Sequence, residues 1–494
     1  MRGRAGCTER GDQLEEVLKL VAEAPSERRI VTFRSGRRGA AFVMPSKTLR
    51  FSRQAPRIEF CRGRAGRNPA LGAVGRRSGN LRDWKQLVAV PAGYSSIGMV
   101  VIGAALSPSL CGEAKLSESF ILNLAGRSST GKSLMTIVAM SVQGEASRRA
   151  VVPPDLTERA FEEAGVAFNE LLMPIDDLNQ VKDAKSVRAT ARFLAYHFCD
   201  GGGRTVSDTV MKRGELPFER FSAVGLVSFE ESSSAIAKLA GVRRRPGETV
   251  RMFDLPVDQT RGVFDRVPTD ESRPVSEIIR SLEAALCVHY GVALPEFLKW
   301  LHQKGPRWRA RRLGKLTGEF VERYSNEGDG VTRRAAQKFG LIYAALVMAR
   351  SAGITPWSKR EVRKVMRASF LQALSVERED SASISNEELV CRLQDALKMP
   401  GAIVELSADR ELPDDNGSWV LVRGISTKDG RVDGLRLSRL ESIFPHRDHR
   451  SRLLEELANR GVISRLAKHG SFQPRLKRAG RTVKLRVIPF KGLL

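Results

Sequence analysis

Residues 126–133 read Gly-Arg-Ser-Ser-Thr-Gly-Lys-Ser, which fits the pattern GxxxxGK[ST] of a phosphate-binding loop. Residues 120–125 before the loop are mostly apolar and predict a buried strand, and the apolar residues 134–140 after it predict a core helix. This order of strand, loop and helix gives the pattern a mechanism, because backbone N–H groups and the helix N-terminus can then surround a phosphate. The plainer alternative is a glycine turn between two buried elements, with a lysine on its surface.

The loop predicts how a nucleoside triphosphate would be held. Lys132 would reach the β- and γ-phosphates, and the Ser133 hydroxyl would be a ligand of Mg²⁺. We therefore expect ATP and Mg²⁺ as cofactors. The expected nucleotide-binding residues are Gly126, Ser128, Ser129, Thr130, Gly131, Lys132 and Ser133.

A second set of candidates follows another apolar run. Asp176 and Asp177 come directly after residues 171–175, and in a parallel sheet both motifs would lie at the carboxyl ends of strands, where ligands bind. Asp176 is the expected Mg²⁺ or Mg²⁺-water ligand, and Asp177 would polarise the attacking water. The alternative is a surface turn after a strand, and Pro174 is unusual within a central strand.

The remaining catalytic candidates are a serine and two arginines. Ser228 follows a predicted strand and would sense the γ-phosphate or orient water, although a plain loop serine fits equally well. Phosphoryl transfer gains from an arginine supplied by the same or an adjacent subunit. Arg244, within the run Arg243 to Arg245, and Arg251 are the candidates, and the same residues would also suit a DNA-facing basic loop.

Charge points to a polyanionic partner. The chain of 494 residues has a net charge of +26. Residues 28–82 contain fifteen Lys/Arg and one acid, residues 460–494 contain ten and no acid, and the segment 304–312 interleaves basic residues with Trp308. Solvated faces or an arginine-rich genome would also explain such runs. Three separate runs favour nucleic acid, with Trp308 expected to stack on bases.

Composition also indicates the cellular compartment in which the protein is expected. Six cysteines without CxxC spacing argue against a disulfide framework or a zinc site, so we expect a cytoplasmic protein. No signal peptide is evident at the N-terminus. The most apolar stretch, residues 87–110, contains prolines and glycines, so we expect a buried helix and no membrane partner.

The order of elements predicts the α/β class, with a central, mostly parallel sheet in a P-loop NTPase core. Its strands are expected at residues 120–125, 150–152, 171–175, 223–227 and 249–253. Four domains are expected. They are a basic N-terminal region with a short helix, β-strands and a linker (1–82), the ATPase core (83–270), a helical domain (271–385) and a basic, winged-helix-like α+β domain (386–494).

With these residues in view, the chain resembles the family called domain of unknown function 927, helicase-like P-loop ATPases of bacterial chromosomes, prophages and mobile elements. The stretches that carry the resemblance are 41–45, Trp84, 125–133, 141–144, 171–180, 243–256 and 334–357. The resemblance implies an ATP-driven motor that forms a homo-oligomer, with a hexameric ring expected.

The chain departs from the family in two places. Asp177 stands where the family usually has Glu, and Ser228-Phe229-Glu230-Glu231 replaces a run like Ser-Thr-Gly-Glu. Because no primase-like acidic motif is apparent, priming would need a separate primase.

We therefore expect an ATP-dependent DNA translocase or helicase acting in the replication or maintenance of a mobile element, with hydrolysis between subunits. The alternative is a nucleotide-switched DNA-binding loader, initiator or defence protein with little ATP turnover. A small-molecule kinase would use the same loop but would leave the basic segments unexplained.

Overall fold

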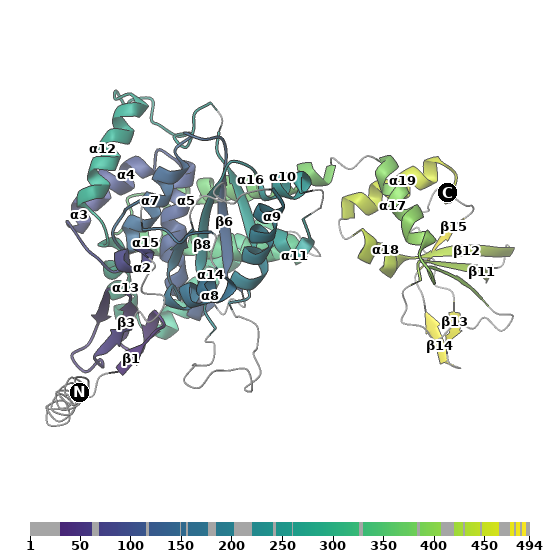
Figure 1. The fold of residues 1–494 in the computed structure, drawn as a ribbon, viewed down its shortest axis with the longest axis horizontal. Coiled ribbons are helices and arrows are strands. Elements are labelled where there is room, and N and C mark those ends of the chain that lie inside the picture. The colour runs from purple at the N-terminus through teal and green to yellow at the C-terminus, as the bar shows by residue number, and fades with distance from the viewer. Residues whose placement is uncertain are drawn as a thin grey trace, which may run out of the picture.

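The computed structural model describes residues 30–61, 69–114, 118–148, 150–154, 157–175, 184–201, 220–240, 244–258, 260–325, 330–382, 386–406, 419–427, 430–444, 447–463, 475–478, 481–484 and 487–490. Its main body is a mixed α/β structure around a parallel sheet, and residues 386–490 form a second unit (Figure 1).

The central sheet has four parallel strands in the order β7-β8-β6-β9. The strands are β6 (Phe120–Ala125), β7 (Leu172–Pro174), β8 (Val224–Phe229) and β9 (Met252–Pro256). Nearly all of their residues are buried, as expected for a sheet covered on both faces. The predicted parallel sheet is confirmed, and β6 has the predicted bounds.

Two predicted strands differ in the structure. Residues 150–152 form only an isolated parallel bridge from Val152 to Ile175. The fifth strand begins at Met252 instead of residue 249, because Pro246–Thr249 form the helical turn α11. A proline at the first position of a helix is favourable, which explains why a turn forms at Pro246.

Helices pack on the sheet and share one hydrophobic core. This core runs from Phe42 to Ala373, so it crosses the expected boundary between residues 270 and 271. The helices described in the main body are α2 (Pro69–Ala73), α3 (Leu81–Trp84), η2 (Lys85–Ala89), α4 (Val90–Ala92), α5 (Ser96–Leu106), η3 (Ser107–Leu110), α6 (Cys111–Ala114), α7 (Lys132–Gln143), α8 (Glu158–Ala167), α9 (Ala184–Phe193), η5 (Leu194–Phe198), α10 (Ser233–Leu239), α11 (Pro246–Thr249), α12 (Val275–Val288), α13 (Ala293–Lys304), α14 (Pro306–Tyr324), α15 (Gly330–Ser351) and α16 (Lys359–Ala382).

The most apolar of these helices lies inside the core. Among the described residues, only Ser96–Ala114 is long and apolar enough to cross a membrane, and 78% of its apolar window is buried within the protein. α5 packs against α7 and α15, which accounts for its apolar surface all round.

The N-terminal strands form two small sheets. β2 (Gly36–Arg38), β3 (Ala41–Met44) and β4 (Lys47–Arg50) form an antiparallel meander, and β1 (Ile30–Thr32) pairs in parallel with β5 (Ile58–Phe60). The helix predicted for residues 11–24 lies outside the described residues.

The C-terminal unit has its own cores and a four-stranded sheet in the order β10-β11-β12-β15. Residues 483–484 belong to β14 and residues 487–488 to β15. The winged-helix assignment stays a prediction. The elements are α17 (Asn386–Lys398), β10 (Ile403–Glu405), β11 (Leu421–Thr427), β12 (Gly430–Arg436), α18 (Leu437–Ile443), α19 (Arg447–Asn459), β13 (Arg475–Arg478), β14 (Arg481–Lys484) and β15 (Val487–Phe490).

Candidate functional site

The glycine-rich loop joins the carboxyl end of β6 to the start of α7. Ser129 and Gly131 have positive φ values of 62° and 95°, so the chain turns sharply here. Gly131 precedes the first residue of α7, and a Cβ at this position would lie 2.6 Å from the Val263 side chain. Glycine is therefore required at this position both by its backbone conformation and by its neighbour.

Lys132 lies at the centre of the loop. Its Nζ donates hydrogen bonds to the Gly126 carbonyl and, at 2.7 Å, to the Arg127 carbonyl, and only 7% of the residue is exposed. The cation is thus held over the loop backbone, where phosphate oxygens could replace these carbonyl oxygens as partners. Ser133, the expected Mg²⁺ ligand, is exposed on the first turn of α7.

Two observations indicate that the loop can accommodate a phosphate group. Gly126 and Gly131 leave a cradle that Cβ atoms would narrow, since a Cβ on Gly126 would meet Val257 at 3.0 Å. The N-terminus of the twelve-residue helix α7 also faces the loop. Ser128 and Ser129 are exposed, and Thr130 donates its hydroxyl to the Arg127 carbonyl at 2.9 Å.

The predicted sensor lies on a strand of the central sheet, whereas the predicted acids lie outside the described residues. The described range that ends at Ile175, just after β7, stops before Asp176 and Asp177. Ser228 is 8% exposed in β8, which lies between β6 and β7. The next residue, Phe229, accepts a hydrogen bond from the Gly126 N–H at 3.1 Å, so Ser228 lies beside the start of the loop. Among the described residues, no group of three His, Cys, Asp or Glu side chains could hold a metal.

The segment that follows β9 braces the loop at both ends, and sequence reasoning missed it. The Val257 N–H donates to the Ala125 carbonyl at 2.7 Å, and the Val263 N–H donates to the Thr130 carbonyl at 3.0 Å. Gly262 (φ 59°) lies so close to the loop that a Cβ would be 2.8 Å from the Thr130 carbonyl oxygen. The pattern Asp-x-x-x-Gly after a strand was the available signal for this turn.

The turn of this segment holds an arginine. Asp258 accepts hydrogen bonds from the backbone N–H of Thr260 and of Arg261 and forms an ion pair with the Arg261 guanidinium at 2.9 Å. The Arg261 backbone N–H, followed by the bonds to Thr260, holds the pKa of Asp258 well below its usual value. Arg261 is exposed, in the turn after β9, the strand that flanks β6 on the side opposite β8.

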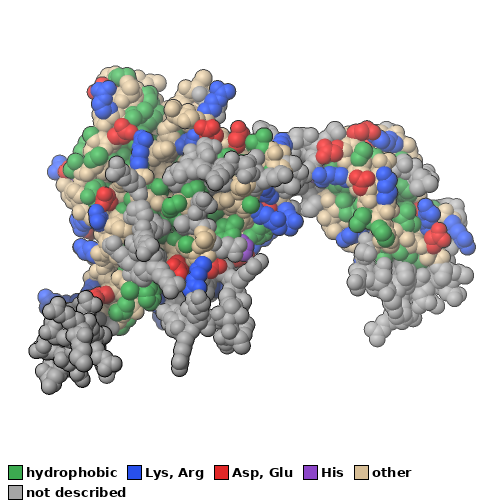
Figure 2. All heavy atoms as spheres, in the orientation of Figure 1, with side chains coloured by type: hydrophobic (Ala, Val, Ile, Leu, Met, Phe, Trp, Pro, Cys, Tyr) green, Lys and Arg blue, Asp and Glu red, His purple; other side chains and the backbone are tan. Residues whose placement is uncertain are grey.

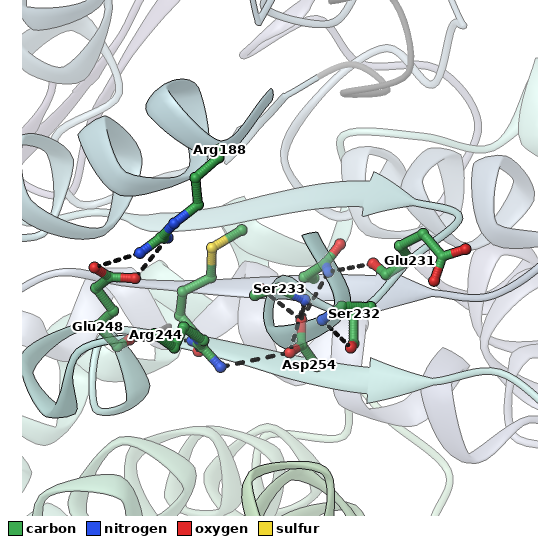
Figure 3. A network of polar contacts seen from close by, with 10 residues as sticks. Arg188, Glu231, Ser232, Ser233, Arg244, Glu248 and Asp254 are labelled. Atoms are coloured by element: carbon green, nitrogen blue, oxygen red, sulfur yellow. Dashed lines mark hydrogen bonds and ion pairs between the residues drawn. The ribbon is translucent and has the colours of Figure 1, made fainter. Parts of the chain in front are cut away.

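A buried polar network lies between β6 and β9, centred on Asp254 (Figure 3). The Asp254 carboxylate is 1% exposed and accepts hydrogen bonds from the Asn123 amide, the Ser233 hydroxyl (both 2.7 Å) and the Ser233 N–H. A buried carboxylate needs such donors to remain charged, so the network is a condition of the fold at this position. In Figure 3 the Glu231 carboxylate points away from this network.

Arg244 belongs to the same network. Its side chain is 5% exposed, its Nη1 lies 3.5 Å from Asp254, and its Nη2 donates to the Glu248 carbonyl at 3.2 Å and to the Met252 carbonyl. Arg188 of α9 forms a buried ion pair with the Glu248 carboxylate at 2.6 Å (Figure 3). The structure therefore places Arg244 inside the subunit, where it stabilises the network.

Arg251 lies near the amino-terminal ends of the strands, whereas the loop lies at their carboxyl ends. It precedes β9 and accepts a backbone hydrogen bond from Ile121 near the start of β6, roughly 15 Å along the strands from the loop. Its guanidinium pairs with Glu118 at 2.7 Å and Asp200 at 2.9 Å and lies over the Tyr196 ring. The structure brings neither Arg244 nor Arg251 to the loop.

The basic segment 304–312 divides into internal and exposed residues. Trp308 packs edge-on against Trp300 at 5.3 Å, and Lys304 lies over both rings. Arg309 is buried in an ion pair with Glu113 at 2.5 Å. The tryptophan predicted to stack on bases therefore packs within the protein. On the face shown in Figure 2, Lys and Arg side chains are spread over both units, with acidic side chains between them.

The comparisons with known proteins agree with the resemblance seen in the sequence. A family model described as "Domain of unknown function (DUF927)" matches residues 5–211. A solved structure titled "SCCmec type IV Cch - active helicase" has a similar fold, with a TM-score of 0.56 and 14% identity over 97% of this chain and 82% of that chain. No curated protein matches. The resemblance is confirmed: residues 5–211 of this chain match the family of domain of unknown function 927, and its fold is similar to that of this helicase.

Proposed function

We propose that this chain is an ATP-dependent, helicase-like motor that moves along DNA in the replication or maintenance of a mobile genetic element. The observation that carries the proposal is the glycine-rich loop, with Lys132 held over it at the carboxyl edge of a parallel sheet. The similarity of the fold to a helicase structure supports it.

ATP and Mg²⁺ would be held by this chain's own residues in defined roles. Backbone N–H groups of residues 128–133 and the Lys132 ammonium would bind the phosphates, and the Ser133 hydroxyl and Asp176 would hold Mg²⁺. Mg²⁺ would neutralise the phosphate charge that develops during hydrolysis. Asp177 would position water, and Ser228, beside the loop, would sense the γ-phosphate.

An arginine near the phosphates is needed to complete such a site. Arg244 and Arg251 form ion pairs away from the loop, whereas Arg127 lies within the loop and Arg261 lies in the turn that braces it. A neighbouring subunit would supply any further arginine, so we propose a homo-oligomer, with a hexameric ring as the assembly to test. Priming would fall to a separate primase, and the cytoplasm is the proposed location.

The test is hydrolysis of ATP by the full chain and by Lys132→Ala, with and without single-stranded DNA. We expect the wild-type chain to hydrolyse ATP and DNA to stimulate it. The variant should lose hydrolysis by at least about a hundredfold, since a charged contact to the transferred group is removed. Lys299→Ala, which removes an exposed lysine of α13, is the matched control and should keep the activity. Unchanged hydrolysis in Lys132→Ala would refute the assignment.

A second candidate is a nucleotide-switched DNA-binding protein with little turnover. Asp177, one methylene shorter than the glutamate usual in the family, favours it because water placement would change. Tight ATP binding without multiple turnovers, even with DNA present, would select this candidate over the motor.

A further inference from the structure

One face of α14 carries exposed cations beside glycines. At about 100° per residue, Arg307, Arg311, Gly314 and Gly318 fall on one line along this helix, and Lys315 lies next to it. The opposite line holds the buried residues Arg309, Leu313, Leu316 and Phe320. The helix therefore has an inner face that packs on α15 and an outer face that these five residues form.

The cations of the outer face form no ion pair with the residues that the structure describes. Among the described residues, Arg307, Arg311 and Lys315 have no ion-pair partner, whereas the buried Arg309 on the inner face pairs with Glu113. Arg307 lies in the first turn of α14, at the positive end of the helix dipole, and that turn contains no acid. This placement is unfavourable in the isolated protein and becomes favourable when an anion binds.

The two glycines contact no other part of the chain among the described residues. A Cβ on Gly314 or on Gly318 would meet no described atom within 4 Å. Glycine in a helix interior destabilises the helix relative to alanine, and nothing on the inside of the protein requires it here. A bare helix surface instead permits a close approach by something outside the chain.

We infer that this outer face of α14 — Arg307, Arg311, Gly314, Lys315 and Gly318 — binds the phosphate backbone of a single DNA strand. The inference rests on the proposed function and names its DNA-contacting surface. Cations one turn apart, about 6 Å along the helix, form a line one side chain wide. Arginine and lysine side chains are common partners of phosphate oxygens, and contacts to phosphates carry no sequence information.

The first test measures salt-dependent binding of a labelled oligo(dT) to the full chain without nucleotide. The triple variant Arg307→Ala/Arg311→Ala/Lys315→Ala should bind more weakly. Its slope of log Kd against log salt, between about 50 and 200 mM, should be shallower by about 2, because three phosphate contacts are lost. The control Arg280→Ala/Arg360→Ala/Lys364→Ala removes the same charge from exposed positions on α12 and α16, outside the three basic runs, and should keep the wild-type slope. An equal change in both triple variants would overturn the inference.

The second test separates a binding role from a structural one. Gly314→Ala/Gly318→Ala should raise the Tm by roughly 1–3 °C per substitution, since alanine favours the helix, and should still weaken oligo(dT) binding several-fold. Unchanged binding would show that the glycines admit no partner. Tighter binding of duplex than of single-stranded DNA by the wild-type chain would overturn the single-strand assignment. ATP hydrolysis without DNA, compared with Lys132→Ala, tests the proposed function independently of these results.

Discussion

At the scale of single residues, Asp254 is the centre of the buried polar network between β6 and β9. Its carboxylate is buried and is satisfied by donors from three segments, which include Asn123 in the loop strand and Ser233 at the start of α10. Arg244 joins this network from the segment before α11. A charge in such a position is tolerated only while its partners remain, so each of them is a stabilising residue.

We expect Arg244→Ala to lower the free energy of unfolding of the main body by roughly 2–4 kcal/mol, because buried acceptors lose a charged donor. Calorimetry would show this as a lower Tm. Arg245 next to it is exposed, so Arg245→Ala should change stability by no more than about 0.5 kcal/mol. If Arg244→Ala kept the Tm of the wild type but lost ATP hydrolysis, Arg244 would instead act on the nucleotide.

At the scale of elements, the turn between α8 and β7 docks the N-terminal meander onto the main body. The Asn169 amide donates to the Ser35 carbonyl at 2.8 Å, and the Glu170 carboxylate accepts the Arg37 N–H at 3.0 Å. Glu170 has a positive φ of 57°, uncommon for a residue with a side chain. Burial raises the pKa of the Glu170 carboxyl, against the opposing effect of Arg37.

A raised pKa in the folded protein means that stability is lost as the pH rises through that pKa. Above its raised pKa the Glu170 carboxylate is charged at a cost in stability. We expect Glu170→Gln to have a Tm equal to or higher than that of the wild type at pH 7, with the difference shrinking as the pH falls toward about 4. Melting curves across this range would measure it. Exposed Glu322→Gln should show no such trend, and a pH-independent difference would contradict the assignment.

At the scale of the whole molecule, the main body and the C-terminal unit have separate hydrophobic cores. One cluster extends from Phe42 to Ala373 and joins the sheet to α14, α15 and α16, while the C-terminal clusters contain only residues from 389 onward. Cooperative unfolding follows shared cores, so the main body should behave as one unit.

We expect a chain that ends after residue 385 to keep its calorimetric transition and its ATP hydrolysis, because no side chain of the main core is removed. A chain that ends after residue 270 should fail to fold, since it loses the helices that cover the sheet. Circular dichroism and melting of both truncated chains would test this. A folded, ATP-hydrolysing chain that ends at 270 would show that the helical region is independent.

The sequence by itself determined the local part of the site. The loop 126–133, the strand before it and the helix after it follow from a short pattern, because each depends on neighbours in sequence. The tertiary structure alone decided that β8 lies between β6 and β7, that Arg244 is buried beside Asp254, and that the segment 257–263 braces the loop. These contacts join residues distant in sequence, and packing of the whole core selects them, so no local pattern could specify them.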